Sequence, residues 1–292
     1  MKIQTECIPC LLKRILFETE ISTKDKKLQH KTMKNACMLL AELYDPNVAS
    51  CNIATKVHKL VYDTLGDKDP YKDLKIQANK AAEKLVPRVE ELIGIADDKL
   101  RMAMLCSIIG NMMDFGIEGA SSKPEMLLDI FESTLSEDLG HDDYEQVQDI
   151  IKKSKNVLLF TDNCGEIVFD KILCRELKKF NPDMFLTVVV RGEAILSDAT
   201  MEDAIEYKLD EEADEILTTG CFTVGVDFER MPDKVSKRLD ECDIIIAKGM
   251  GNYETFSETD YKPIAYLMRT KCSAIANSAG VPQNINVIKL YK

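Results

Sequence analysis

The sequence has no tryptophan and only three histidines, which are His30, His58 and His141. A metal centre built from several histidines is therefore not expected, and carboxylates and amides remain as ligands, which favours magnesium or manganese. A basic excess is also missing, because 38 lysines and arginines stand against 50 aspartates and glutamates, for a net charge of −12. That charge argues against a nucleic-acid partner, although a local basic pocket could still bind a small phosphorylated molecule.

Long apolar runs are absent as well. No stretch approaches the roughly 20 apolar residues that a membrane-spanning helix needs, and the first residues lack the apolar core of a signal peptide. We therefore expect a cytoplasmic protein without a membrane partner, while its oligomeric state stays open. Ten cysteines in such a chain favour free thiols, small buried residues or metal ligands over a disulfide framework.

The two halves of the chain differ in pattern, and the predicted boundary lies near Ser154. Residues 1–153 show helical periodicity with few β-branched runs, which predicts a helical domain. In residues 154–292 apolar runs alternate with helical segments, which predicts βαβ units and a mainly parallel sheet. The expected strands are residues 156–161, 185–190, 215–218, 243–248, 274–277 and 287–290. The last of them could pair antiparallel at an edge.

The most informative stretch runs from Thr161 to Glu166 and reads TDNCGE. A short apolar run precedes it, as in a buried strand, and helical periodicity follows it. Asp162 and Asn163 are therefore expected where a strand ends and a helix begins. Because open α/β sheets bind ligands at the carboxyl ends of their strands, these two side chains are candidate ligands.

Three more expected strand ends carry polar residues. They are Arg191 with the following Ser197-Asp198-Ala199-Thr200, Lys248 with the following GMGNYE, and residues 277–280. In a parallel sheet these ends meet at one edge, so that oxygen ligands for a hard cation and positive charges for a phosphoryl group would converge. The glycines would let backbone amides approach an anion.

Each of these features has a plainer interpretation. An Asp-Asn pair after a strand often serves only as a turn and helix cap. Arg191 and Lys248 could be solvated surface charges, and the Gly-x-Gly that starts at Gly249 lacks the spacing of a dinucleotide fingerprint. The coincidence of four polar strand ends nevertheless favours a site.

The pair Cys7 and Cys10 has three interpretations that the sequence alone does not separate. Two thiols at this spacing can bind a metal, form a redox pair or bury small side chains. A tetrahedral zinc site would need two further ligands, and no second CxxC is present.

Three motifs in combination resemble the DUF89 family of metal-dependent damage-control phosphatases, of which ARMT1-like proteins are a branch. They are residues 161–166, Val190-Arg191-Gly192 with Asp198-Ala199-Thr200, and residues 248–254. The resemblance extends to Asp69-Pro70-Tyr71 and to residues 110–116, so it covers most of the chain, and the CxxC start resembles the compact, mainly prokaryotic branch. It implies a helical domain paired with a Rossmann-like three-layer α/β domain, with the site between them.

The resemblance also implies roles for individual residues. A divalent metal, Mg²⁺, Mn²⁺, Co²⁺ or Ni²⁺, would be held by Asp162, Asn163 and Asp198. Lys248 is similar to the phosphate-contacting lysine of the family. Further site-lining positions are Arg191, Asn111, Asp114, Asn252 and Glu166. Cys164 and Ser197 stand where alanine and asparagine are common, which leaves substrate preference open.

We therefore predict a hydrolase: a metal-dependent phosphatase acting on phosphomonoesters of small metabolites, such as sugar phosphates or damaged phosphometabolites. Lys248 and Asp162 are the predicted catalytic residues, with Lys248 stabilising phosphoryl charge. Water activated by the metal is favoured over Asp162 as the nucleophile, because a carboxylate committed to a metal is a poorer nucleophile. The alternative is a non-catalytic or redox protein that binds a nucleotide or metabolite and uses Cys7 and Cys10.

Overall fold

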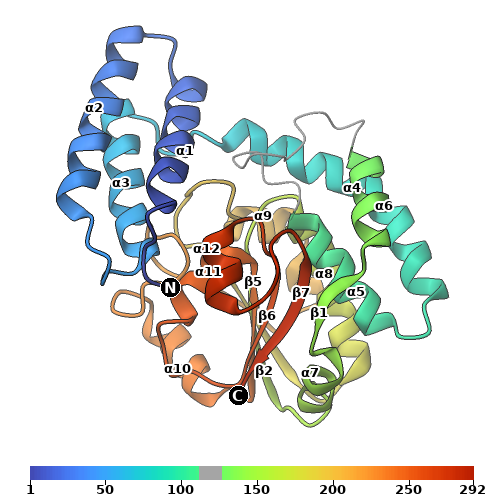
Figure 1. The fold of residues 1–292 in the computed structure, drawn as a ribbon. Helices are drawn as coiled ribbons and strands as arrows, with labels where there is room; N and C mark the ends of the chain where they lie inside the picture. The colour runs from blue at the N-terminus through green and yellow to red at the C-terminus, as the bar shows by residue number, and fades with distance from the viewer. Residues whose placement is uncertain (112–126) are drawn as a thin grey trace.

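The computed structural model describes residues 1–111 and 127–292 and confirms a mixed α/β fold (Figure 1). The helices of the first half are α1 (Cys7–Ser22), α2 (Lys26–Leu43), α3 (Ser50–Leu65), α4 (Lys72–Ile95), α5 (Lys99–Gly110), α6 (Leu127–Ser136) and α7 (Tyr144–Ile151). Helices α1 to α3 form a bundle at one end of the molecule, and α4 leads from it toward α5 and α6 (Figure 1). Among the described residues no helix is long and apolar enough to cross a lipid bilayer.

A single seven-stranded sheet carries the rest of the fold. Its strands are β1 (Leu139–Asp142), β2 (Asn156–Phe160), β3 (Phe185–Val190), β4 (Glu215–Thr218), β5 (Ile244–Lys248), β6 (Ile264–Arg269) and β7 (Asn286–Tyr291). Their order is β1-β7-β6-β5-β2-β3-β4, and all neighbours are parallel except β6 and β7. The remaining helices are α8 (Glu166–Phe180), α9 (Met201–Glu206), α10 (Asp233–Glu241), α11 (Gly249–Phe256) and α12 (Ser273–Ala279).

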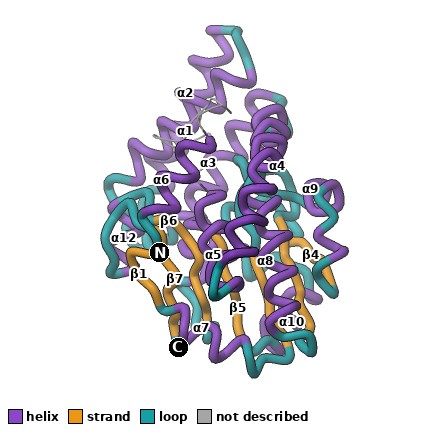
Figure 2. The backbone as a smooth tube through the Cα atoms, turned by 90° about the vertical axis from the view of Figure 1, so that its right-hand side faces the viewer, coloured by secondary structure: helices purple, strands orange, loops and turns teal. Residues whose placement is uncertain are grey.

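Apolar side chains point alternately to the two faces of the sheet, and helices pack on both faces, which produces three layers. In β2, Val157 and Leu159 pack with α4, α5 and α8 on one face of the sheet. The intervening Leu158 and Phe160 pack with α10, α11 and α12 on the other face. Both faces of a parallel sheet are thus covered, which explains why the strands read as continuous apolar runs. Figure 2 shows the strands side by side, with α1 and α2 rising beyond them.

Two expectations about the strands were wrong. Residues 274–277 belong to α12, where the alanines favour a helix and Gly280 ends it in the left-handed conformation, with φ +66°. Strands β1 and β6 were not expected, although Ile264–Arg269 is buried throughout, as a central strand should be. Strand β7 does pair antiparallel with β6, but β1 covers its outer side, so β7 is not an edge strand.

The domain boundary near Ser154 stays a prediction. Strand β1 precedes it and joins the sheet beside β7. A third apolar cluster lies within α1, α2 and α3, and it reaches the second half of the chain at Ile195, Leu196 and Phe222. The hydroxyl of Tyr62 accepts a hydrogen bond from the Leu196 amide at 3.0 Å. The helical bundle therefore contacts the segment that leads to Asp198.

Candidate active site

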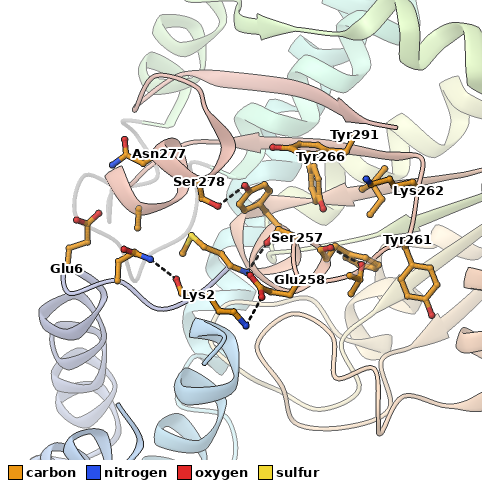
Figure 3. A pocket seen from close by; sticks show the side chains of 17 residues that line it. Lys2, Glu6, Ser257, Glu258, Tyr261, Lys262, Tyr266, Asn277, Ser278 and Tyr291 are labelled. Atoms are coloured by element: carbon orange, nitrogen blue, oxygen red, sulfur yellow. Dashed lines mark hydrogen bonds and ion pairs between the residues drawn. The ribbon is translucent and has the colours of Figure 1, made fainter. Parts of the chain in front are cut away.

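Three of the four predicted polar strand ends lie at one edge of the sheet. Strands β5, β2 and β3 are parallel neighbours, so Lys248, the Asp162–Asn163 pair and Arg191 all follow from adjacent carboxyl ends. The fourth expected end does not join them, because residues 274–277 are helical. Asn277 and Ser278 instead line another cavity, of about 610 Å³ (Figure 3). That cavity contains none of the predicted site residues that the structure describes.

The two loops with the predicted metal ligands are held together by direct contacts. The amide of Ala199 donates to the Asp162 carbonyl at 2.8 Å, and Asn163 forms a backbone bridge with Asp198. The hydroxyl of Ser197 donates to Asn163 Oδ1 at 2.7 Å. Asp162, Asn163 and Asp198 therefore come from two loops that form one unit.

Arg191 lies between the two aspartates. Its Nε donates to Asp198 Oδ2, and its Nη2 lies 3.6 Å from Asp162 Oδ1. The side chain is only 1% exposed, and its third nitrogen donates to the Gly225 carbonyl at 2.7 Å. Nη2 has no hydrogen-bond partner. Arg191 is thus not a solvated surface charge but a buried link between the two carboxylates.

Lys248 is fully buried behind the Asp162 loop. Its ammonium group contacts the carboxylates of Glu166 and Asp170, the latter at 2.6 Å. Although burial works against the charge, these two carboxylates raise the pKa of Lys248. Because its charge is paired twice, its contact with a phosphate group stays a prediction. Asp170 was not predicted from the sequence, although it lies one helical turn after Glu166 on the same face of α8.

Asn111 connects the Lys248 group to the Asp162 loop. Its Nδ2 donates to Asp162 Oδ2 at 2.9 Å and to Glu166 Oε2 at 2.6 Å. Asn111 is the residue that follows α5, and it is 2% exposed. The structure therefore places Asn111 between Asp162 and Glu166, and its contact with a substrate stays a prediction, while Asp114 lies outside the described residues.

The side chain of Asn252 bonds to the backbone at the ends of two neighbouring strands. Its Nδ2 donates to the carbonyls of Thr161 and Lys248, at 2.9 and 2.7 Å, and so joins the ends of β2 and β5. Its Oδ1 has no hydrogen-bond partner. Asn252 and Glu166 are both fully buried, and their contact with a substrate stays a prediction.

The turn after β5 requires a glycine. Gly249 has φ +72°, and a Cβ atom at this position would lie 1.9 Å from Asp162 Oδ2. Any side chain here would displace the carboxylate, so glycine allows the start of α11 to approach Asp162 closely.

Negative charge is in excess in this buried group. The carboxylates of Asp162, Glu166, Asp170 and Asp198 are each at most 7% exposed, and the buried cations with them are Arg191 and Lys248. Burial, followed by the nearby Asp198 and Glu166, raises the pKa of Asp162 well above its ordinary value. With all four carboxylates ionised, the described residues of this group carry two more negative than positive charges, and a divalent cation would balance them.

The predicted ligands fit such a cation by their chemistry. Two carboxylates and one amide oxygen are hard ligands that suit magnesium or manganese. Among residues 1–111 and 127–292, no three histidine, cysteine, aspartate or glutamate side chains are grouped as a metal site. The predicted set contains only two residues of those types, so it relies on Asn163 and on further oxygen ligands from water or phosphate.

A cavity of about 340 Å³ opens onto the predicted ligands. Its lining includes Asn111, Asp162, Asn163 and Asp198, together with Cys7, Cys10 and Arg14 from α1 and Lys271 and Cys272 after β6. Sequence reasoning missed Lys271 because β6 itself was not predicted. Lys271 donates to the Asn111 carbonyl, so a cation lies beside the site.

The thiol pair lies in the same cavity as the predicted ligands. Cys10 is exposed and Cys7 is half-buried, and both are free thiols. Burial is the main cause that raises the pKa of Cys7, which favours its neutral thiol. His58 is not grouped with them as a ligand, because it is 1% exposed and paired with Glu18 at 2.9 Å.

The chain is similar over its whole length to one family. Residues 3–287 match the family described as the damage-control phosphatase ARMT1-like domain. A damage-control phosphatase of Archaeoglobus fulgidus is 38% identical, and the match covers all of both chains. A second one, from Pyrococcus horikoshii, is 30% identical over 97% of this chain and 96% of its own. The crystal structure of a DUF89 family protein from Pyrococcus horikoshii has a TM-score of 0.90 and 29% identity, over all of both chains.

Proposed function

Because the chain belongs to the ARMT1-like family of damage-control phosphatases, we propose that it is a divalent-metal-dependent phosphatase that hydrolyses phosphomonoesters of small metabolites. The observation that carries this proposal is the surplus of buried negative charge where the loops of Asp162 and Asp198 meet. A divalent cation there turns a costly cluster of carboxylates into a binding site for a phosphate group.

Three residues would hold the cation. They would be Asp162 and Asn163, which follow β2, and Asp198, which lies in the loop after β3. When bound, the cation neutralises phosphoryl charge and makes water a stronger nucleophile. Sugar phosphates and damaged phosphometabolites are the proposed substrate class, since a cavity of about 340 Å³ suits a small molecule.

The other residues of the site position these ligands and supply charge. Arg191 keeps the two aspartates at a constant separation through contacts with both. Asn111 donates to Asp162 Oδ2 and so orients that carboxylate. We retain Lys248 as a proposed source of positive charge, acting from behind Glu166, and its buried position argues for an indirect effect on the phosphoryl group.

The first test is hydrolysis of p-nitrophenyl phosphate by the purified full-length chain. We expect turnover with magnesium, manganese, cobalt or nickel and none after treatment with a chelator, because the site needs a cation to balance its carboxylates. Release of p-nitrophenol is followed by its absorbance. Absence of activity with all four metals, together with tight nucleotide binding, would favour the alternative of a non-catalytic binding protein.

The nucleophile is tested by rapid acid quenching of a single turnover. We expect no phosphorylated protein at any time point, because Asp162 already accepts hydrogen bonds from Asn111 and Asn163 and is a proposed metal ligand. Mass spectrometry of the peptide with Asp162 gives the answer. A phosphate group on that peptide, gained and lost within the turnover, would show that Asp162 attacks phosphorus directly.

A further inference from the structure

Asn79 lies outside the sequence motifs of the site but contacts the TDNCGE loop. It lies in α4 and is 2% exposed. Its Oδ1 accepts a hydrogen bond from the Gly165 amide at 2.5 Å. Gly165 has φ +83° and ends the TDNCGE loop at the first turn of α8. The side chain of Asn79 therefore holds the turn that follows Asp162 and Asn163.

The other end of the same amide reaches the second loop. Asn79 Nδ2 donates to Asp203 Oδ1 at 3.1 Å. The second oxygen of Asp203 accepts from the amide and the hydroxyl of Thr200, at 2.9 and 3.0 Å. Thr200 lies two residues after Asp198 and forms a backbone bridge with Arg191. One amide group of α4 is thus hydrogen-bonded directly to the first ligand loop and, through Asp203 of α9, indirectly to the second.

Two features show that this link has a defined geometry. Only one orientation of the Asn79 amide satisfies both neighbours, because Gly165 offers a donor and Asp203 offers an acceptor. Thr200 and Asp203 also form a capping box at the start of α9, which fixes the Asp203 carboxylate relative to the second loop.

We propose that the Asn79–Asp203 link sets the separation of the Asp162–Asn163 loop and the Asp198 loop, and that Asn79 is thereby a positioning residue for the divalent cation. The metal part of this inference rests on the proposed function. Residues that orient metal ligands without touching the metal typically change metal affinity or activity by about 10–100-fold.

The test compares Asn79→Ala with a matched variant, Asn181→Ala. Asn181 is also buried, at 9% exposure, and its Nδ2 donates to the carbonyls of Ile151 and Ser154, both at 2.8 Å and away from the site. Binding of Mn²⁺ to the full-length protein is measured by isothermal titration calorimetry. We expect Asn79→Ala to raise the Kd for Mn²⁺ about tenfold or more, and Asn181→Ala to leave it unchanged. Saturating Mn²⁺ should restore much of the kcat of Asn79→Ala, which a general loss of folding would not permit.

A second measurement does not depend on the metal. Amide hydrogen exchange of the metal-free protein is followed by NMR. In Asn79→Ala we expect exchange at Gly165 and Thr200 to become about tenfold faster or more, while the strand amide of Leu159 keeps its protection. The variant Asn79→Asp retains an acceptor for Gly165 but loses the donor toward Asp203. It should therefore protect Gly165 and not Thr200.

The outcomes separate the two proposals. Unchanged exchange at both amides, or an equal loss of Mn²⁺ affinity in Asn181→Ala, overturns the positioning role of Asn79. If the unmodified protein neither binds Mn²⁺ nor hydrolyses phosphate esters, the proposed function fails, and the exchange rates alone then decide whether the link between the loops exists.

Discussion

Asp162→Ala is expected to abolish metal-dependent turnover, with a loss of about 10³-fold or more in kcat/KM on p-nitrophenyl phosphate, since a catalytic metal contributes several kcal/mol. Among the proposed metal ligands, Asp162 contacts three other residues of the site. It accepts from Asn111 and Asn163, at 2.9 and 2.7 Å, and faces Arg191 at 3.6 Å. Its removal leaves one carboxylate and one amide for the cation.

The same variant should remain folded without metal. Burial and the carboxylates around it raise the pKa of Asp162, so its charge is costly in the folded chain, and removing that charge should not lower stability. Thermal unfolding with and without Mn²⁺ provides the measurement. The metal should raise the Tm of the unmodified protein and leave that of Asp162→Ala unchanged.

Cys7→Ser is the control for this prediction. Cys7 lines the same cavity but supplies no proposed ligand, so turnover should stay close to that of the unmodified chain. Two results would contradict the assignment: metal-dependent turnover that survives in Asp162→Ala, or turnover that is lost in Cys7→Ser. Loss of turnover in Cys7→Ser would indicate that the thiols take part in the reaction.

Lys248→Met is expected to lower the free energy of unfolding by about 3–5 kcal/mol, which is typical when one partner of a buried ion pair is removed. Lys248, Glu166 and Asp170 are all fully buried, and the ammonium group is the cation that both carboxylates contact. Methionine fills a similar volume but leaves two acidic groups unpaired in the core. Urea denaturation of the metal-free protein measures the change.

Lys237→Met is the matched control. Lys237 is 71% exposed and lies 3.8 Å from Glu241 on the surface of α10, so its loss should change stability by less than about 0.5 kcal/mol. Adding Glu166→Gln and Asp170→Asn to Lys248→Met should recover part of the lost stability, because the unpaired charges disappear. Equal stability of Lys248→Met and Lys237→Met would show that the buried ion pairs contribute little.

Local pattern was sufficient to predict that Asp162, Asn163 and Arg191 lie at the ends of neighbouring strands. The strand, turn and helix around TDNCGE are encoded by residues next to one another, and the rule for parallel sheets then brings Arg191 close to Asp162. The same rule fails for residues 277–280, because the short apolar segment before them, Ala274-Ile275-Ala276, fits a helix as well as a strand.

Residues that reach the site from elsewhere could not be predicted in this way. Asn79 contacts the ligand loop at Gly165 only because α4, α5 and α8 pack together on one face of the sheet. No short-range pattern specifies that packing. Lys271 depends in turn on the position of β6, a strand whose buried run was visible in the sequence but not recognised.

Two different parts of the chain line the 340 Å³ cavity, the loops at the sheet edge and helix α1. The loops at the sheet edge supply the oxygen atoms of the proposed ligands, whereas α1 supplies Cys7, Cys10 and Arg14. Substitutions at Cys7 and Cys10 can therefore reshape the cavity around a new molecule while all three proposed metal ligands are kept. Directed evolution of this enzyme class toward other phosphate esters should begin with that helix, and it should leave Gly249 untouched.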